Sequence, residues 1–107
     1  MSVLRDVEIE QRLAGVPQWH RVGGSGEHGA DGSSAGQDAI ARELAFADFK
    51  EAVAFVNRVA EAAEAANHHP DILVHGWNKV RLTLSTHSAG GLTDADFELA
   101  ARLDRLA

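Results

Sequence analysis

The feature that most constrains the fold is a long alanine-rich stretch over residues 47–67. Neither glycine nor proline interrupts it, and alanine has the highest helix propensity of any residue. Apolar residues recur at steps of three or four, the spacing of an amphipathic helix, at Phe49, Val53, Val56, Ala60 and Ala63. Pro70 disfavours helical geometry in the residue before it. The sequence therefore predicts one long helix that ends near Asn67.

Two shorter helices are predicted near the ends of the chain. Residues 6–14 have apolar side chains at loosely helical spacing, and a glycine and a proline follow them. The second helix is expected over about 93–106. Thr93 would cap it, and Asp96 stands three residues later, where it completes a variant capping box.

Four segments have the composition and the alternating pattern of strands. They cover residues 19–22, 40–46, 71–75 and 80–85. In the last of them Val80, Leu82 and Leu84 would share one face. Gly76 marks a bulge or a turn between the final two strands.

The order helix, strand, strand, helix, strand, strand, helix predicts an α+β fold. A four-stranded antiparallel sheet would carry three helices packed on one face. At 107 residues the chain is one domain over 1–107. Residues 23–36 contain six glycines and no large apolar residue, so they are predicted to form a flexible loop insertion.

Composition excludes several classes of function. The chain has no cysteine, which excludes a disulfide framework, a thiolate metal site and a cysteine nucleophile. The formal charge of −6 disfavours unspecific binding to nucleic acid, which depends on basic patches. No apolar stretch approaches the length of a membrane span, so we expect no membrane partner and a cytoplasmic location.

Histidines gather where the long helix is expected to end. His68 and His69 precede Pro70, and His87 follows the last predicted strand. Histidine titrates near neutrality, so this group is suited to proton transfer at physiological pH. Two other interpretations remain. One imidazole could simply bind the last helix carbonyls. Alternatively His68, His69 or His75, and His87 could hold a metal, although the spacing fits no standard zinc pattern.

The three histidines belong to a longer pattern of spaced residues. It reads Glu64-x3-His68-His69-Pro70, six residues, Trp77, nine residues, His87, eight residues, Asp96. This pattern, together with the strings Leu82-Thr83-Leu84-Ser85-Thr86-His87 and Gly91-Leu92-Thr93, closely resembles the pterin-4a-carbinolamine dehydratase family. The resemblance covers roughly residues 40–105 and implies a fold of the same α+β kind.

The resemblance also implies a reaction, the elimination of water from a 4a-hydroxytetrahydropterin to give the quinonoid dihydropterin. Acid–base catalysis suffices for this step, so no metal and no cofactor are expected. His68, His69 and His87 would be the catalytic set, with His68 and His87 as general acids or bases and His69 orienting the pterin. The pterin would contact two segments, formed by Asn67, His68 and His69 and by Ser85, Thr86, His87 and Ser88.

Two acidic residues would support the site. Glu64 lies four residues before His68 and could orient its imidazole, or it could be a solvated charge on the helix. Asp96 belongs to the family pattern, yet a capping role fits it equally well. Trp77 could stack near the site, or it could be a core or interface aromatic.

The resemblance and the unprotected sheet edges together predict a homodimer or a homotetramer. A second class of function stays open, in which the same fold binds a pterin without turnover or serves as a protein-interaction module.

Overall fold

The computed structural model describes residues 2–23 and 37–107. Most of the predicted glycine-rich loop, residues 24–36, therefore lies outside the described part of the chain. The elements are α1 (Asp6–Leu13), β1 (His20–Val22), β2 (Ala39–Ala45), α2 (Phe49–Ala66), β3 (Asp71–His75), β4 (Lys79–Leu84), the short 3-10 helix η1 (His87–Ala89) and α3 (Asp94–Asp104). Apart from η1, which the sequence did not predict, these are the expected elements in the expected order.

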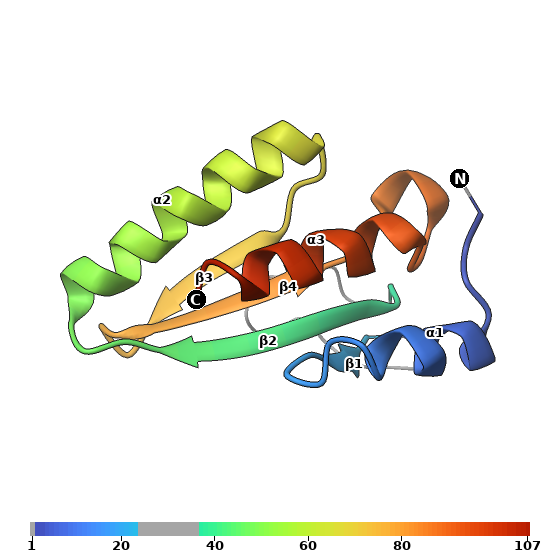
Figure 1. Ribbon diagram of the computed structural model, residues 1–107, viewed down its shortest axis with the longest axis horizontal. Helices are drawn as coiled ribbons and strands as arrows, with labels where there is room; N and C mark the ends of the chain where they lie inside the picture. Colours follow the sequence, from blue (N-terminus) through green and yellow to red (C-terminus); the bar gives the residue numbers. More distant parts are fainter. Residues whose placement is uncertain (1, 24–36) are drawn as a thin grey trace.

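The four strands form one antiparallel sheet in the order β1-β2-β4-β3 (Figure 1). The register places Ile40 opposite Leu84 and Leu44 opposite Val80, so these apolar side chains share one face. All three α-helices contribute to the cluster of buried side chains on that face, through Ile9, Phe55, Leu99 and Leu103. The predicted α+β architecture, with three helices on one face of the sheet, is confirmed.

Helix α2 begins where Asp48 caps it, because the Asp48 carboxylate accepts a hydrogen bond of 2.8 Å from the amide of Glu51. Its buried stripe differs from the predicted one. The buried residues are Ala52, Phe55, Val59, Ala62 and Ala63, whereas Phe49 is 55% exposed. Both stripes have helical spacing in this alanine-rich sequence, and each contains one phenylalanine, Phe49 or Phe55, so the spacing alone did not decide which stripe faces the core. Of the predicted stripe, Ala63 is buried and Val56 is partly buried against the core, while Phe49 and Ala60 are exposed.

Helix α3 is fixed at both ends. At its start, the carboxylate of Asp96 accepts a hydrogen bond from the Thr93 amide, which confirms this half of the predicted capping box. Near its end, Asp104 accepts hydrogen bonds from the Trp19 indole (2.8 Å) and from the Arg42 guanidinium (2.5 Å). These bonds hold α3 against the first half of the sheet and so fix the position of Asp96.

The turn between β3 and β4 carries an exposed aromatic side chain. Gly76 and Trp77 both have positive φ angles, of 56° and 61°, and Trp77 is 62% exposed. The predicted turn at Gly76 is present, and Trp77 is not a core residue. Within residues 2–23 and 37–107, no helix has the length and apolar character needed to cross a membrane.

Candidate functional site

The end of α2 determines where the adjacent histidines point. Asn67 has a left-handed conformation (φ 51°, ψ 43°). Its amide donates a hydrogen bond to the carbonyl of Glu64, and the His68 amide donates one to the carbonyl of Ala63. These two bonds form a Schellman motif, in which asparagine is a common substitute for glycine. The chain leaves the helix axis at Asn67, so His68 and His69 no longer follow helical spacing.

His68 points inward, toward the start of α3. Its side chain is 15% exposed, and its Nε2 lies 2.6 Å from Oδ1 of Asp96, whose own side chain is fully buried. A carboxylate in this position fixes the orientation of the imidazole ring. The structure therefore brings together two residues that are 28 positions apart in the sequence.

The second oxygen of Asp96 is bound just as closely. Oδ2 accepts hydrogen bonds from the Thr86 hydroxyl (2.8 Å) and from the Thr93 amide (2.9 Å), and the two threonine hydroxyls lie 2.8 Å apart. We call His68, Asp96, Thr86 and Thr93 the carboxylate network. It joins the end of α2, the segment after β4 and the start of α3.

His87 follows Thr86 directly and begins η1, so its backbone is fixed next to the carboxylate network. Thr86 forms an isolated antiparallel bridge with Gly91, with a hydrogen bond of 2.9 Å from the Thr86 amide. This bridge closes the loop that carries His87 and Ser88, both of which are exposed. The two predicted catalytic positions, His68 and His87, thus come from segments that Asp96 and Thr86 connect.

His69 points away from the network. Its Nε2 lies 2.5 Å from Oε2 of Glu64, and the two side chains are 59% and 76% exposed. Of the two roles left open for Glu64, orienting His68 or being a solvated charge, the first is wrong, because the structure pairs Glu64 with His69. The reason is the left-handed turn at Asn67, which ends the helix before the four-residue spacing reaches His68.

The hydroxyls of Ser85 and Thr86 are not free to meet a pterin, although both residues stand in the predicted substrate segment. Ser85 is 7% exposed, and its Oγ accepts a hydrogen bond from Gln37 Nε2 (2.6 Å) and donates one to the Asp38 carbonyl (2.7 Å). Thr86 is 5% exposed and belongs to the carboxylate network. Asn67 and Ser88, in contrast, are exposed.

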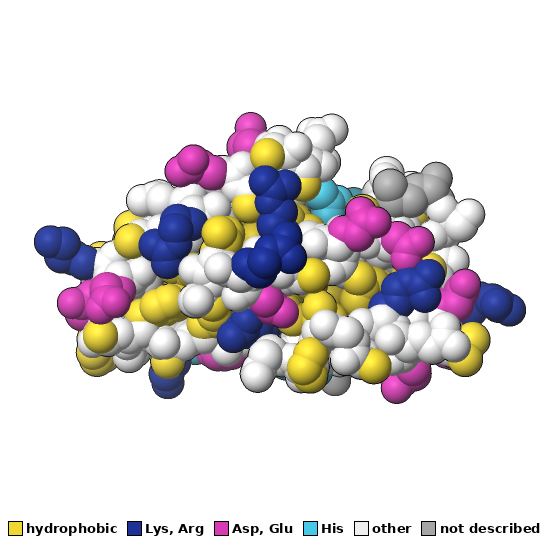
Figure 2. Space-filling view, viewed as in Figure 1, with side chains coloured by type: hydrophobic (Ala, Val, Ile, Leu, Met, Phe, Trp, Pro, Cys, Tyr) yellow, Lys and Arg dark blue, Asp and Glu magenta, His cyan; other side chains and the backbone are white. Residues whose placement is uncertain are grey.

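A hollow of about 160 Å³ borders His68 between α2 and α3. It is lined by Ala66, His68, Ala95, Glu98, Leu99 and Arg102. Figure 2 shows histidine side chains at the surface beside the C-terminal end of α2, next to acidic side chains. Ligand pockets usually measure about 300–1,000 Å³, so this hollow could enclose only part of a bicyclic ligand.

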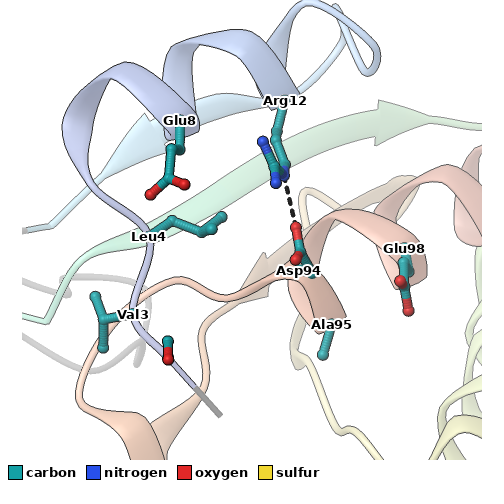
Figure 3. A pocket seen from close by; sticks show the side chains of 8 residues that line it. Val3, Leu4, Glu8, Arg12, Asp94, Ala95 and Glu98 are labelled. Carbon is teal, nitrogen blue, oxygen red and sulfur yellow. Dashed lines mark hydrogen bonds and ion pairs between the residues drawn. The ribbon is translucent and has the colours of Figure 1, made fainter.

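A second hollow, of about 480 Å³, lies between the N-terminal segment, α1 and α3 (Figure 3). An ion pair of 2.5 Å between Arg12 and Asp94 crosses it, and its hydrogen bond raises the pKa of Arg12. None of the predicted site residues lines it. The described residues also contain no group of three or more histidines and carboxylates that could hold a metal ion.

Sequence reasoning did not assign Thr93 to the site. It predicted Thr93 as a helix cap, and the structure gives its hydroxyl a second role beside Thr86. The capping-box spacing of Thr93 and Asp96 could have indicated this site. A carboxylate that caps a helix with one oxygen has a second oxygen free to bind another group.

Comparison with known proteins identifies the family of this chain. The sequence model of the family described as pterin 4 alpha carbinolamine dehydratase matches residues 2–106. A protein of Thermomicrobium roseum is 45% identical over 107 residues, covering 100% of this chain and 99% of the relative. One of Gloeobacter violaceus is 48% identical over 103 residues, covering 96% and 100%. Both names provisionally assign the proteins to the pterin-4-alpha-carbinolamine dehydratases.

Solved structures lead to the same family. The crystal structure of a transcriptional coactivator/pterin dehydratase from Brucella melitensis matches with a TM-score of 0.80 and 31% identity, over 99% of both chains. A pterin dehydratase-like protein, described as a RuBisCO assembly factor in the alpha-carboxysome, matches with a TM-score of 0.63 and 25% identity, over 84% of this chain and 89% of that one. The chain therefore belongs to the pterin 4 alpha carbinolamine dehydratase family.

Proposed function

We propose that this protein removes water from a 4a-hydroxytetrahydropterin and releases the quinonoid dihydropterin. The observation that carries the proposal is the 2.6 Å contact between His68 and the buried Asp96, which orients an imidazole at a surface hollow. Family membership supports dehydratase chemistry in general. The geometry adds named groups that could perform it.

The reaction needs two proton transfers. The bond between C4a and its hydroxyl oxygen breaks with both electrons on the oxygen, which leaves as water only if an acid protonates it. A base removes the proton from the neighbouring ring nitrogen, whose electrons then form the new carbon–nitrogen double bond. We propose His68 and His87 for these two roles, because histidine as a residue type is suited to proton transfer and their segments meet at the carboxylate network.

Binding of the pterin would fall to the exposed polar side chains around these two histidines. His69 is held by Glu64 at the surface, and Asn67 and Ser88 are exposed on the two segments. We propose that His69, with its ring fixed by the carboxylate, orients the substrate. Glu64 would then act through His69 and Asp96 through His68.

A stopped-flow assay of 4a-hydroxytetrahydropterin dehydration tests the proposal. The purified protein should accelerate the reaction above its spontaneous rate, and His87→Ala should lower turnover by about 10²-fold or more. If His68 and His87 act as one unit, the double variant should lose little more than the worse single variant. A wild-type protein that binds the pterin without accelerating dehydration would refute the enzymatic proposal.

Two solved relatives favour a second candidate function. One is described as a transcriptional coactivator as well as a pterin dehydratase, and the other as an assembly factor for RuBisCO. This chain could likewise serve as an interaction module. The same assay separates the two functions, because a pure interaction module would not accelerate dehydration of the pterin.

We further propose that the protein forms homodimers or homotetramers. In the described sheet β1 and β3 are the outer strands, and β3 carries Ile72 and Val74, each 36% exposed. The surface stripe of α2 adds Phe49, and Trp77 lies in the turn after β3. Exposed apolar side chains beside an open strand edge favour pairing with a second copy.

A further inference from the structure

We infer that Nδ1 of His68 is the nitrogen that exchanges a proton with the pterin, and that Asp96, Thr86 and Thr93 are positioning residues that select this nitrogen. The inference deepens the proposed function and rests on it. It follows from counting the hydrogen-bond donors and acceptors of the carboxylate network.

Oδ2 of Asp96 accepts one hydrogen bond from the Thr93 amide and another from the Thr86 hydroxyl. A threonine hydroxyl has a single proton. Because Thr86 gives its proton to Asp96, the 2.8 Å contact between the two hydroxyls requires Thr93 to be the donor. The direction of every hydrogen bond on this side of the carboxylate is thereby fixed.

The other side of the carboxylate fixes the imidazole. Oδ1 of Asp96 faces Nε2 of His68 at 2.6 Å, and a proton must lie between the two atoms. Imidazole is a stronger base than a carboxylic acid's anion, and Asp96 already accepts two other hydrogen bonds, so the proton belongs to Nε2. In the neutral ring Nδ1 then carries a lone pair, and in the imidazolium form it carries the transferable proton.

The two threonines matter because they hold the carboxylate in place. Asp96, Thr86 and Thr93 are between 0% and 5% exposed, so water has little access to replace a missing hydroxyl. Without the Thr86 hydroxyl, Oδ2 loses a donor and the carboxylate is free to rotate away from His68. Thr86 and Thr93 therefore act on the imidazole through Asp96, without touching the substrate.

Nitrogen NMR of the free protein tests the tautomer directly. Protein labelled with ¹⁵N-histidine, at a pH where the imidazoles are neutral, should show His68 protonated on Nε2 and bare on Nδ1. The His68 signals are assigned by their absence in His68→Gln. A His68 ring protonated on Nδ1 would overturn the inference, whatever the protein's activity.

Variants of Thr86 test the positioning role. Thr86→Val, which lacks only the hydroxyl, should lower kcat by about tenfold with little change in KM and should shift the pH profile of kcat. Thr86→Ser restores the hydroxyl and should recover most of the loss. Thr83→Val, another buried threonine on β4 outside the carboxylate network, is the matched control and should match the wild type.

Two outcomes separate the inference from the proposed function. A wild type inactive on the pterin defeats the proposed function, while the tautomer of His68 is still read by NMR. If the wild type is active and Thr86→Val leaves kcat and its pH profile unchanged, only the positioning role is refuted. If Thr86→Val fails to fold, Thr93→Val replaces it, with Thr93→Ser as the rescue.

Discussion

Asp96 is fully buried in the first turn of α3, and its two carboxylate oxygens serve different parts of the molecule. Oδ2 caps the helix at Thr93, and Oδ1 binds the imidazole of His68. The sequence presented capping and support of catalysis as competing roles for this residue. The structure shows that one carboxylate has enough lone pairs for both contacts.

The second histidine and its carboxylate lead to a prediction about substrate binding. His69→Ala should raise KM more than it lowers kcat, since His69 orients the pterin in our account. Glu64→Gln should show a weaker effect of the same kind, because it removes the charge that holds the imidazole. Steady-state kinetics checks both variants.

Glu61→Gln provides the matched control, since Glu61 lies on α2 one turn before Glu64 and is also exposed. It should leave kcat and KM unchanged. If Glu64→Gln behaves like this control while His69→Ala raises KM, then Glu64 is only a solvated surface charge.

At the scale of elements, the sequence predicted every α-helix and strand to within about two residues of its observed ends. Long periodic segments such as α2 are predictable because their spacing repeats over many turns. The short helix η1 was missed because three residues carry no periodicity. The pairing of Glu64 was missed for a different reason, since the left-handed Asn67 redirects the chain before His68.

The start of α3 should be a weak point for substitutions. Asp96→Ala removes the acceptor of two described hydrogen bonds on Oδ2 and the partner of His68, all of them buried or nearly so. We expect a loss of roughly 3 kcal/mol in the free energy of unfolding. That corresponds to a melting temperature lowered by more than about 10 °C.

Asp94→Ala serves as the control in the same helical turn. Its side chain is 58% exposed and pairs with Arg12 at the surface, so its loss should be much smaller. Thermal denaturation that shows equal losses for Asp94→Ala and Asp96→Ala would contradict the role given to the buried carboxylate.

The ends of the glycine-rich segment lie close together. A Cβ atom on Gly23 would fall 2.0 Å from the carbonyl oxygen of Gln37, and Val22 pairs with Ala39 across β1 and β2. Replacing residues 24–36 by a two-glycine turn should therefore keep the fold. We expect the melting temperature to stay within about 5 °C of the wild type. A larger fall, measured by circular dichroism, would show that the segment stabilises the domain.

At the scale of the whole molecule, the three helices cover one face of the sheet, and β1 and β3 are its outer strands among the described residues (Figure 1). The hydrogen bonds of Asp104 anchor the end of α3 to β2 and to Trp19, directly before β1, and the carboxylate network anchors its start to the segment after β4 and to the end of α2. The side chain of His68 is thus fixed by buried groups. The pattern of spaced residues predicted a site, and the tertiary contacts show that Asp96 pairs with His68 and Glu64 with His69.

Sedimentation at micromolar concentration tests the proposed oligomer. The wild type should sediment as a dimer or a tetramer, and Val74→Lys should shift it toward the 11.4 kDa monomer by placing a charge beside the β3 edge. Val7→Lys changes an exposed apolar residue on α1 and should leave the assembly unchanged. A wild type that sediments only as the monomer would contradict the proposal.

The central claim is that His68, oriented by Asp96, transfers a proton during pterin dehydration. The most direct measurement compares wild type and His68→Ala in the stopped-flow dehydration of 4a-hydroxytetrahydropterin, with the spontaneous rate subtracted. We predict a clear acceleration by the wild type and a loss of about 10²-fold or more in the variant, with the fold intact by circular dichroism. Equal rates for the two proteins would contradict the account.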